Sequence, residues 1–470
     1  MKPRSDDAAV KPRFAFELDV PAAKLAFGRV VVFALLAADA LAQIRHAPRY
    51  GAGFNVAQLP GLDALGPGRV GYGLGELVLA YAFVLIACGV ATRWLVPLAA
   101  VIYNWLYFGS QLDSYQHHYL VAMLLIIACF VPWQREVALD QPVRSWALRL
   151  MLVQLGIVYL WAAISKVDPL WLDGSALGGQ LHGSLRSLID ATIGMRAVAI
   201  LVPLTELALV LVWMRPAWPY LASLGILFHL GIVWTGLEIG LFAWLMIGLY
   251  LFVVPDRVYL AVVDRLAPVR ARATELAAAL DRRRWIVFAV AVVAGLACAI
   301  ACRLPGAFVI AIVATVCVLA AGLRRRRVVT VALAHLLALA TWLAIDRTTS
   351  IARDYYKFWG GSARRLNDPA AAETAYRHLS ELAPDDASAH FNLGRLLLAH
   401  DDVTGLDELH ASQRLDRAHA RAYIAEAQWL ATHDRLADAV AAAQAGVAAE
   451  PNDAEARNLV TTLLARSHAR

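Results

Sequence analysis

Charged residues and cysteines are both scarce in this sequence. Asp, Glu, Lys and Arg make up 17% of the 470 residues, whereas 60% are hydrophobic. Soluble domains usually carry about 25% charged residues, so this composition excludes a disordered chain and argues against an ordinary soluble enzyme. The five cysteines all lie inside apolar runs, without a Cys-x-x-Cys pair. We therefore predict neither a disulfide-stapled fold nor a structural metal.

Long apolar runs recur from the first part of the chain to about residue 345. Each run must be helical where it crosses lipid, because lipid offers no partner for backbone N–H and C=O groups. We predict an all-α, polytopic transmembrane bundle of about eleven spans that resides in the lipid bilayer. The predicted spans are 27–43, 72–91, 94–109, 118–132, 147–164, 197–214, 217–235, 238–254, 285–302, 306–323 and 328–345.

The distribution of Lys and Arg orients these spans. With a cytoplasmic N-terminus, the inner segments hold twenty-two Lys and Arg residues and the outer segments seven. Positive charge concentrates on the cytoplasmic side of membrane proteins, so we predict a cytoplasmic, basic N-terminal segment over residues 1–26. An odd number of spans then places the C-terminal tail outside the cytoplasm. The net charge of +6 belongs to these loops, so we expect no nucleic-acid partner.

The C-terminal part, residues 367–470, differs in composition from the apolar part. It is Ala-rich, charged and amphipathic, and Pro384, Arg417 and Pro451 hold equivalent places in three similar stretches, 33 and 34 residues apart. A period of 34 residues is typical of tetratricopeptide repeats, which are pairs of helices. We predict a small α-helical repeat module that binds a peptide or protein partner. A generic Ala-rich array of helical hairpins is the alternative.

Three groups of polar residues lie at or near membrane depth, where ionisable side chains are costly and are candidates for function. The first, in LDSYQHHYLVAML, contains Asp113, His117 and His118. Successive residues on a helix point about 100° apart, so the two histidines cannot both face one site. Interfacial histidines beside aromatic residues are the simpler interpretation.

The second group lies at the end of the predicted span 147–164, and the third in the two predicted spans that follow. Lys166 stands close to Asp168 and Trp171, and the third group contains Glu206 and His229. A lysine pressed against apolar surface can act as a general base near neutral pH. The simpler interpretations are a lysine that reaches the interface and pairs with Asp168, and hydrogen bonds between helices.

These motifs resemble the vitamin K-dependent γ-carboxylase and its bacterial relatives, which share a membrane domain called HTTM. The similarity covers roughly residues 20–260, and we place the membrane domain at 27–260, with additional transmembrane helices at 285–345. Its segments are HHYL, YLWAAISKVDPLWLDG and FHLGIVWTGLEIGLF. The resemblance matches Lys166 to the family's catalytic base and Ser165 to the lysine before it. It also matches His118 to an assisting histidine and His229 to a histidine near the site.

The resemblance implies a reaction as well as a fold. In the family, a lysine deprotonates vitamin K hydroquinone, which reacts with O2 to give a strong base. That base removes a γ-proton from a protein glutamate, and CO2 captures the carbanion. The resemblance therefore implies a reduced quinone with O2 and CO2 as co-substrates, Lys166 and His118 as catalytic residues, and a bacterial inner-membrane location. We expect His229, Trp171, Asp168, His117, Asp113 and Glu206 to contact the substrate or quinone.

Two classes of function remain open from the sequence. The first is a quinol-dependent membrane oxidoreductase or carboxylase-like enzyme, which requires Lys166, His118 and His229 to converge on one outer-facing pocket. The second is a non-catalytic, membrane-anchored repeat scaffold, in which each polar side chain is satisfied by a neighbour. The sequence lacks the family's β-rich lumenal domain and has further spans and the repeats instead. A transporter is a weaker third option, because no clear inverted repeat is present.

Overall fold

The structure is a computed structural model that describes residues 16–51, 53, 55–61, 63–113, 115–133, 138–181, 183–214, 219–235, 241–301, 315–316, 328–347 and 350–468. It divides into two compact units. The first contains residues 1–41, 56–67 and 74–343, and the second contains residues 42–55, 68–73 and 344–470.

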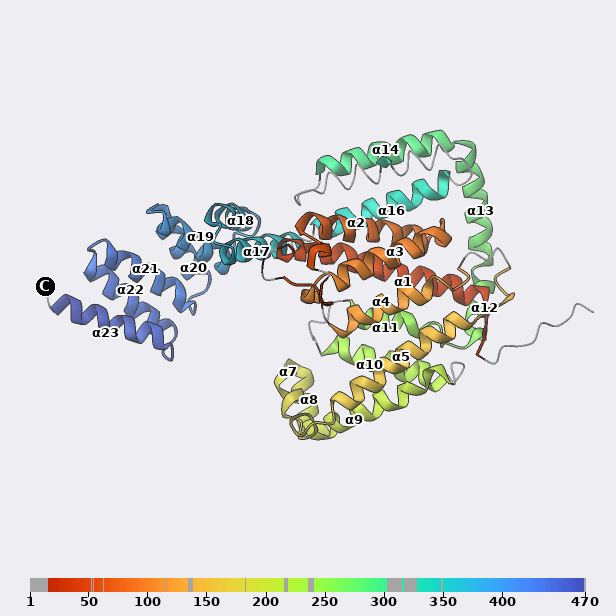
Figure 1. Ribbon diagram of the computed structural model, residues 1–470, viewed down its shortest axis with the longest axis horizontal. Helices are drawn as coiled ribbons and strands as arrows, with labels where there is room; N and C mark the ends of the chain where they lie inside the picture. Colours follow the sequence, from red (N-terminus) through yellow and green to blue (C-terminus); the bar gives the residue numbers. More distant parts are fainter. Residues whose placement is uncertain are drawn as a thin grey trace, which may run out of the picture. The chain divides into compact units, whose positions relative to one another are not determined.

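The apolar part of the chain is a set of helices (Figure 1). Its α-helices are α1 (Ala22–Gln43), α2 (Arg69–Ala87), α3 (Thr92–Phe108), α4 (Gln116–Ala128), α5 (Trp146–Ser165), α6 (Pro169–Leu172), α7 (Ser175–Gln180), α8 (Gly183–Thr192), α9 (Met195–Leu209), α10 (Pro219–Trp234), α11 (Phe242–Tyr250), α12 (Asp256–Arg265), α13 (Ala267–Arg282), α14 (Arg284–Ala301) and α16 (Val328–Arg347). Short 3₁₀ helices lie at η1 (Ile44–Arg49), η2 (Asp63–Leu65), η3 (Gln111–Asp113) and η4 (Val210–Trp213).

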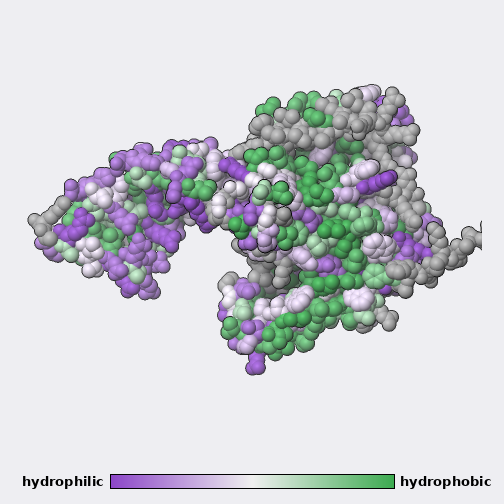
Figure 2. All heavy atoms as spheres, viewed as in Figure 1, coloured by the Kyte–Doolittle hydropathy of each residue, from purple (hydrophilic) through white to green (hydrophobic). Residues whose placement is uncertain are grey.

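Five of the described helices are long and apolar enough to cross a membrane: Ala22–Arg49, Arg69–Ala87, Trp146–Ser165, Met195–Trp213 and Arg284–Ala301. Large apolar side chains also point outward, with Trp161 64% and Val101 69% exposed. Figure 2 shows such hydrophobic surface over the helices of the first unit. Exposed apolar surface of this extent requires a non-aqueous neighbour, so the chain is a membrane protein.

The predicted count of about eleven spans is supported only in part. Every predicted span except 306–323 coincides with a described helix. However, the apolar segments of α4, α10 and α16 are shorter than the five helices that are long enough to cross a membrane. Of the span 306–323, only residues 315–316 belong to the described part of the chain. The helical class is confirmed, and the full number of crossings stays a prediction.

One short β-ribbon departs from the all-α prediction. Strand β1 (Leu18–Pro21) pairs antiparallel with β2 (Pro142–Ser145), and α1 begins directly after β1. The first helix therefore starts at Ala22, inside the segment predicted to be a basic tail. Lys24 is only 4% exposed and pairs with Asp256, because a buried ammonium needs an opposite charge.

Helix α5 lies close to α9 and η4, and a glycine permits this approach. A Cβ atom on Gly156 would lie 3.0 Å from the Val210 carbonyl oxygen of η4. At its start, α5 is capped by Ser145, whose side chain accepts a hydrogen bond from the Leu148 N–H. This capping satisfies one of the free backbone donors at the start of the helix. The α5–α9 contact brings Lys166, at the end of α5, next to Glu206 of α9.

The second unit consists of paired helices with a recurring turn (Figure 1). Its helices are α17 (Ser350–Arg365), α18 (Pro369–Leu382), α19 (Ala387–Ala399), α20 (Thr404–Leu415), α21 (Ala420–Thr432), α22 (Leu436–Ala449) and α23 (Ala454–His468). Asn367, Asp401 and Asp434 each adopt positive φ in the turn within a pair. This repetition matches the 33–34-residue period, and Asn and Asp tolerate left-handed backbone better than most residues.

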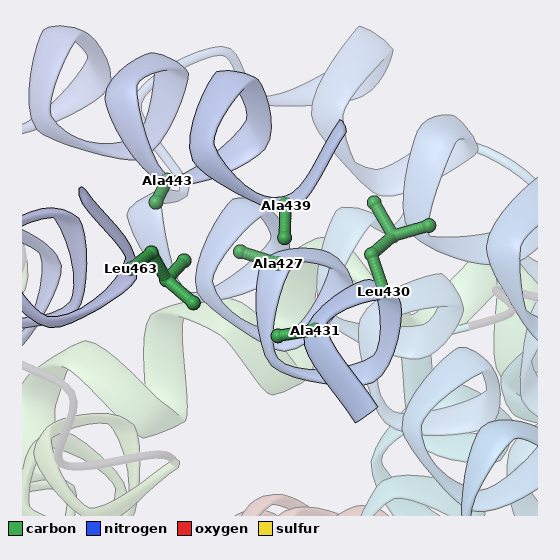
Figure 3. Close-up of a cluster of buried hydrophobic side chains, with 6 residues drawn as sticks. All are labelled: Ala427, Leu430, Ala431, Ala439, Ala443 and Leu463. Carbon is green, nitrogen blue, oxygen red and sulfur yellow. The ribbon is translucent and has the colours of Figure 1, made fainter. Parts of the chain in front are cut away.

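Small and large apolar side chains interlock between these helices. Ala427 and Leu430 of α21 pack with Ala439 and Ala443 of α22 and Leu463 of α23 (Figure 3). The alanines permit close packing of the helices, which explains the alanine-rich composition of this part of the chain. A self-contained helical core therefore runs through the last three helices.

The helical unit begins earlier than the predicted boundary at residue 367. Helix α17 packs against α18, and a Cβ atom on Gly360 would meet the Tyr376 ring. Helix α17 also contacts η1, where Arg45 pairs with Asp354 at 3.1 Å. The Arg69 guanidinium lies 4.3 Å from the centre of the Trp359 ring, a cation–π contact. The segment that directly follows α1 and the first helix of the tail thus belong to one packed unit.

Candidate active site in the membrane bundle

Lys166 lies at the end of α5, and its side chain turns back along the helix. Its Nζ donates hydrogen bonds to the Ala162 carbonyl oxygen at 3.1 Å and to Glu206 Oε1 at 2.8 Å. The ammonium also lies 5.3 Å from the centre of the Trp171 ring. These contacts hold the amine about one helical turn back from the end of α5, against the helix itself.

Glu206 is the buried partner in this ion pair. It lies in α9, and its side chain is 7% exposed, compared with 19% for Lys166. Its Oε2 atom is buried and makes no hydrogen bond with the residues that the structure describes. A buried carboxylate is stable only when it is paired, so Lys166 and Glu206 depend on each other.

Asp168 and Trp171 have separate roles around the lysine. The Asp168 side chain accepts a hydrogen bond from the Leu170 N–H at the start of α6, and Lys166 pairs with Glu206 instead. Trp171 Nε1 donates to the Ala199 carbonyl oxygen of α9 at 2.9 Å. This hydrogen bond fixes the indole ring beside the lysine, whereas Asp168 shapes the turn that carries the ring.

His229 of α10 forms a second polar group on the same face of α5. It is 2% exposed, and the Tyr159 hydroxyl lies 2.6 Å from its Nε2. The Tyr250 ring centre lies 6.3 Å from that of His229, while His229 Nδ1 is buried without a hydrogen-bond partner among the described residues. Tyr159 precedes Lys166 by two helical turns, so α5 carries both polar groups.

The two adjacent histidines of α4 have different neighbours. His118 Nδ1 lies 2.9 Å from the Tyr103 hydroxyl of α3. The His117 ring centre lies 5.4 Å from that of Phe242, and Phe242 in turn lies 6.4 Å from His229. The two imidazole ring centres nevertheless lie only 4.3 Å apart, so the expectation that the two histidines cannot face one site stays a prediction. The side chain of Asp113 lies outside the described part of the structure.

The predicted site residues therefore form linked groups rather than one tight cluster. Lys166, Glu206 and Trp171 form the first group, Tyr159 and His229 the second, and the α4 histidines the third. Phe242 touches the last two groups. Sequence reasoning missed Tyr103, Phe242 and Tyr250, since aromatic residues are common throughout such helices and carried no distinguishing signal.

The described residues contain no group of three His, Cys, Asp or Glu side chains arranged to hold a metal ion. The absence of a metal centre stays a prediction for the whole chain. The polar groups found in the bundle are an amine, a carboxylate, imidazoles and phenols, which suit proton transfer.

Comparison with protein families supplies the identification. Residues 19–256 match the model of the HTTM domain, which is just over half of the chain. The chain belongs to the HTTM domain family. No curated protein matches the chain at a significant level.

The HTTM domain contains all of the predicted site residues. It runs from β1 to the first residue of α12, and it includes Lys166, Glu206, His118 and His229. The helices α14 and α16 and the paired helices of the second unit lie beyond it. The candidate site is therefore a property of the HTTM domain, and the paired helices are an addition to it.

Proposed function

We propose that the HTTM domain binds a reduced, lipid-soluble quinone and that the Lys166–Glu206 pair accepts a proton from it. The observation that carries the proposal is the hydrogen bond of 2.8 Å between the lysine amine and the buried carboxylate. Transfer of one proton across this bond converts the ion pair into a neutral amine and a neutral acid. Burial disfavours charge, so the neutral form is accessible, and the free amine can then act as base.

The surroundings of the pair fit a quinol hydroxyl group. Glu206 Oε2, in the pair itself, is a buried atom without a hydrogen-bond partner among the described residues, and so is His229 Nδ1 in the second polar group on α5. A buried polar atom of this kind is costly unless something binds to it. The Trp171 ring supplies an apolar wall beside the amine. When bound, a reduced quinone would supply electrons to O2 and, as the resemblance to γ-carboxylase implies, the base for carboxylation of a glutamate by CO2.

Quinol oxidation by the purified protein tests this proposal. The wild-type chain in lipid nanodiscs, supplied with a reduced naphthoquinone and O2, is expected to consume oxygen in a quinol-dependent reaction. Lys166→Ala should abolish the reaction, whereas Ser165→Ala should retain it, because the exposed Ser165 hydroxyl bonds to the Ala162 carbonyl oxygen of its own helix. Equal rates in wild type and Lys166→Ala would refute the proposal.

A second candidate function is a membrane-anchored scaffold whose repeats bind a protein partner. The observation in its favour is that Lys166, His118 and His229 each have a protein neighbour that satisfies at least one polar atom. The paired helices with their recurring turns also support a tetratricopeptide-like binding module. Wild-type protein that binds a partner and oxidises no quinol would favour this function over the first.

We further propose that the repeats are extracytoplasmic. The asymmetry of Lys and Arg supports a cytoplasmic N-terminus, and η1, at the far end of α1, packs with α17 in one unit. A periplasmic phosphatase fused after Arg470 is expected to be active in bacterial cells, and a cytoplasmic fluorescent reporter at the same place should stay dark. The opposite pair of results would place the repeats in the cytoplasm.

A further inference from the structure

Three helices of the second unit line a cavity of about 230 Å³. Its wall includes Phe391 and Arg395 from α19, Arg421 and Gln428 from α21, and Glu455 from α23. These helices are the first members of successive pairs, so the cavity spans the repeats. It combines apolar, amide and charged groups, which is the composition of a site for a polar peptide rather than for a purely apolar ligand.

Positive charge at this cavity is not neutralised by ion pairs. Neither Arg395 nor Arg421 forms an ion pair with any residue that the structure describes, and both are exposed. The loss of some hydration inside the cavity, followed by the nearby positive charges of Arg364 and Arg421, lowers the pKa of Arg395, while Glu455 acts in the opposite direction. The guanidinium groups therefore repel each other, and a bound anion would relieve this repulsion.

A third arginine extends the positive charge to α17. Arg364 donates a hydrogen bond of 2.7 Å to Asn392 Oδ1 of α19, which holds it at the junction of the two helices. Arg364 and the adjacent Arg365 also line a separate hollow with Gly361. The positive surface thus follows α17, α19 and α21, and an extended chain can contact several of these arginines at once.

We infer that this cavity binds an acidic, extended segment of a partner protein, whose carboxylates pair with Arg395 and Arg421. The inference rests on the scaffold role proposed above and adds the chemical class of the partner. An apolar side chain between two carboxylates would lie against the half-buried Ala425, and the exposed Gln428 can bind the peptide backbone. The negative charge of Glu455 would repel the densely packed phosphates of an anionic membrane surface. A peptide therefore fits this cavity better than an anionic lipid headgroup does.

Fluorescence anisotropy with the full-length protein in nanodiscs tests the inference. The probe is a fluorescein-labelled peptide of eight residues that alternates glutamate and leucine, compared with matched peptides carrying glutamine or lysine in place of glutamate. We expect the glutamate peptide to bind at least about tenfold more tightly than the glutamine peptide. Its affinity should fall at high salt, because salt screens the attraction between the charges. Equal binding of the two peptides, or preference for the lysine peptide, would overturn the assignment.

Matched variants separate the cavity from general positive charge. The double variant Arg395→Gln/Arg421→Gln should bind the glutamate peptide about tenfold or more weakly than the wild type does. Arg414→Gln/Arg417→Gln removes the same charge from residues outside the cavity and should change binding less than about twofold. Equal losses in both variants, or displacement of the peptide by vesicles of anionic phosphatidylglycerol at low lipid concentration, would contradict a peptide site. Quinol oxidation measured on the same samples reports separately on the HTTM domain.

Discussion

Replacing Lys166 with arginine is expected to lower the rate of quinol oxidation by about 10²–10⁴-fold, as much as replacement with alanine does. A guanidinium keeps its proton at any usable pH, so the arginine variant cannot act as base. It can still donate to Glu206 Oε1 and lie against Trp171, the contacts that the lysine makes now. The variant therefore removes the chemistry and keeps the ion pair.

The arginine variant is the sharper test because its fold can be checked independently. Its thermal unfolding temperature should stay near that of the wild type, whereas its quinol oxidation should fall to the level of Lys166→Ala. Ser165→Ala serves as the control for disturbance at the end of α5. Substantial quinol oxidation by the arginine variant would remove Lys166 from the role of base, while leaving the HTTM fold intact.

The two partners of the ion pair are expected to differ in their effect on stability. Lys166→Met leaves the carboxylate of Glu206 buried without its partner. Such a change typically lowers the free energy of unfolding by about 3–5 kcal/mol. Glu206→Met leaves a lysine whose side chain is already 19% exposed and whose long, flexible stem can carry the ammonium out to water. We expect this second loss to be smaller, about 1–3 kcal/mol.

Thermal unfolding of the two single variants and the double variant in detergent checks this difference. The double variant Lys166→Met/Glu206→Met should recover most of the loss of Lys166→Met, because a buried ion pair can often be replaced by apolar residues without net cost. Two results would contradict this account of the pair, in which Glu206 is the more deeply buried partner. One is a larger loss of stability in Glu206→Met than in Lys166→Met, and the other is a double variant that is no more stable than Lys166→Met.

The helices were predictable from the sequence, because apolar runs must hydrogen-bond internally in lipid. The helical character of the tail was predictable for a different reason: the 33–34-residue spacing of the sequence recurs in the positive φ of Asn367, Asp401 and Asp434, whereas the tetratricopeptide-like class of the module stays a prediction. Both signals are local in sequence. The start of α1 at Ala22 was missed, because the charge of Lys24 suggested that it belonged to the basic N-terminal segment. Its buried position is understandable only with its partner Asp256, which is far away in the sequence.

The partner of Lys166 was not predictable from the sequence. Asp168 is two residues away, whereas Glu206 is forty residues away on another helix. The contact depends on how α5 sits against α9 and η4, where Gly156 allows close approach to the Val210 carbonyl oxygen. Likewise, Tyr159 and His229 meet only because α5 and α10 are neighbours of α9 and η4. Which residues of two neighbouring helices meet depends on side-chain packing along the whole contact. The pattern of residue types along one helix does not determine it.

Photolabelling with a quinone analogue tests the central claim most directly, because it detects occupancy of the site whether or not turnover is measured. Wild-type protein in nanodiscs would be irradiated with a photoreactive naphthoquinone, and the labelled peptides mapped by mass spectrometry. We predict saturable labelling of the end of α5 and of α9, close to Lys166 and Glu206, that unlabelled quinone competes away. Labelling confined to other helices, or labelling that unlabelled quinone leaves unchanged, would show that the Lys166–Glu206 pair is not a quinone site.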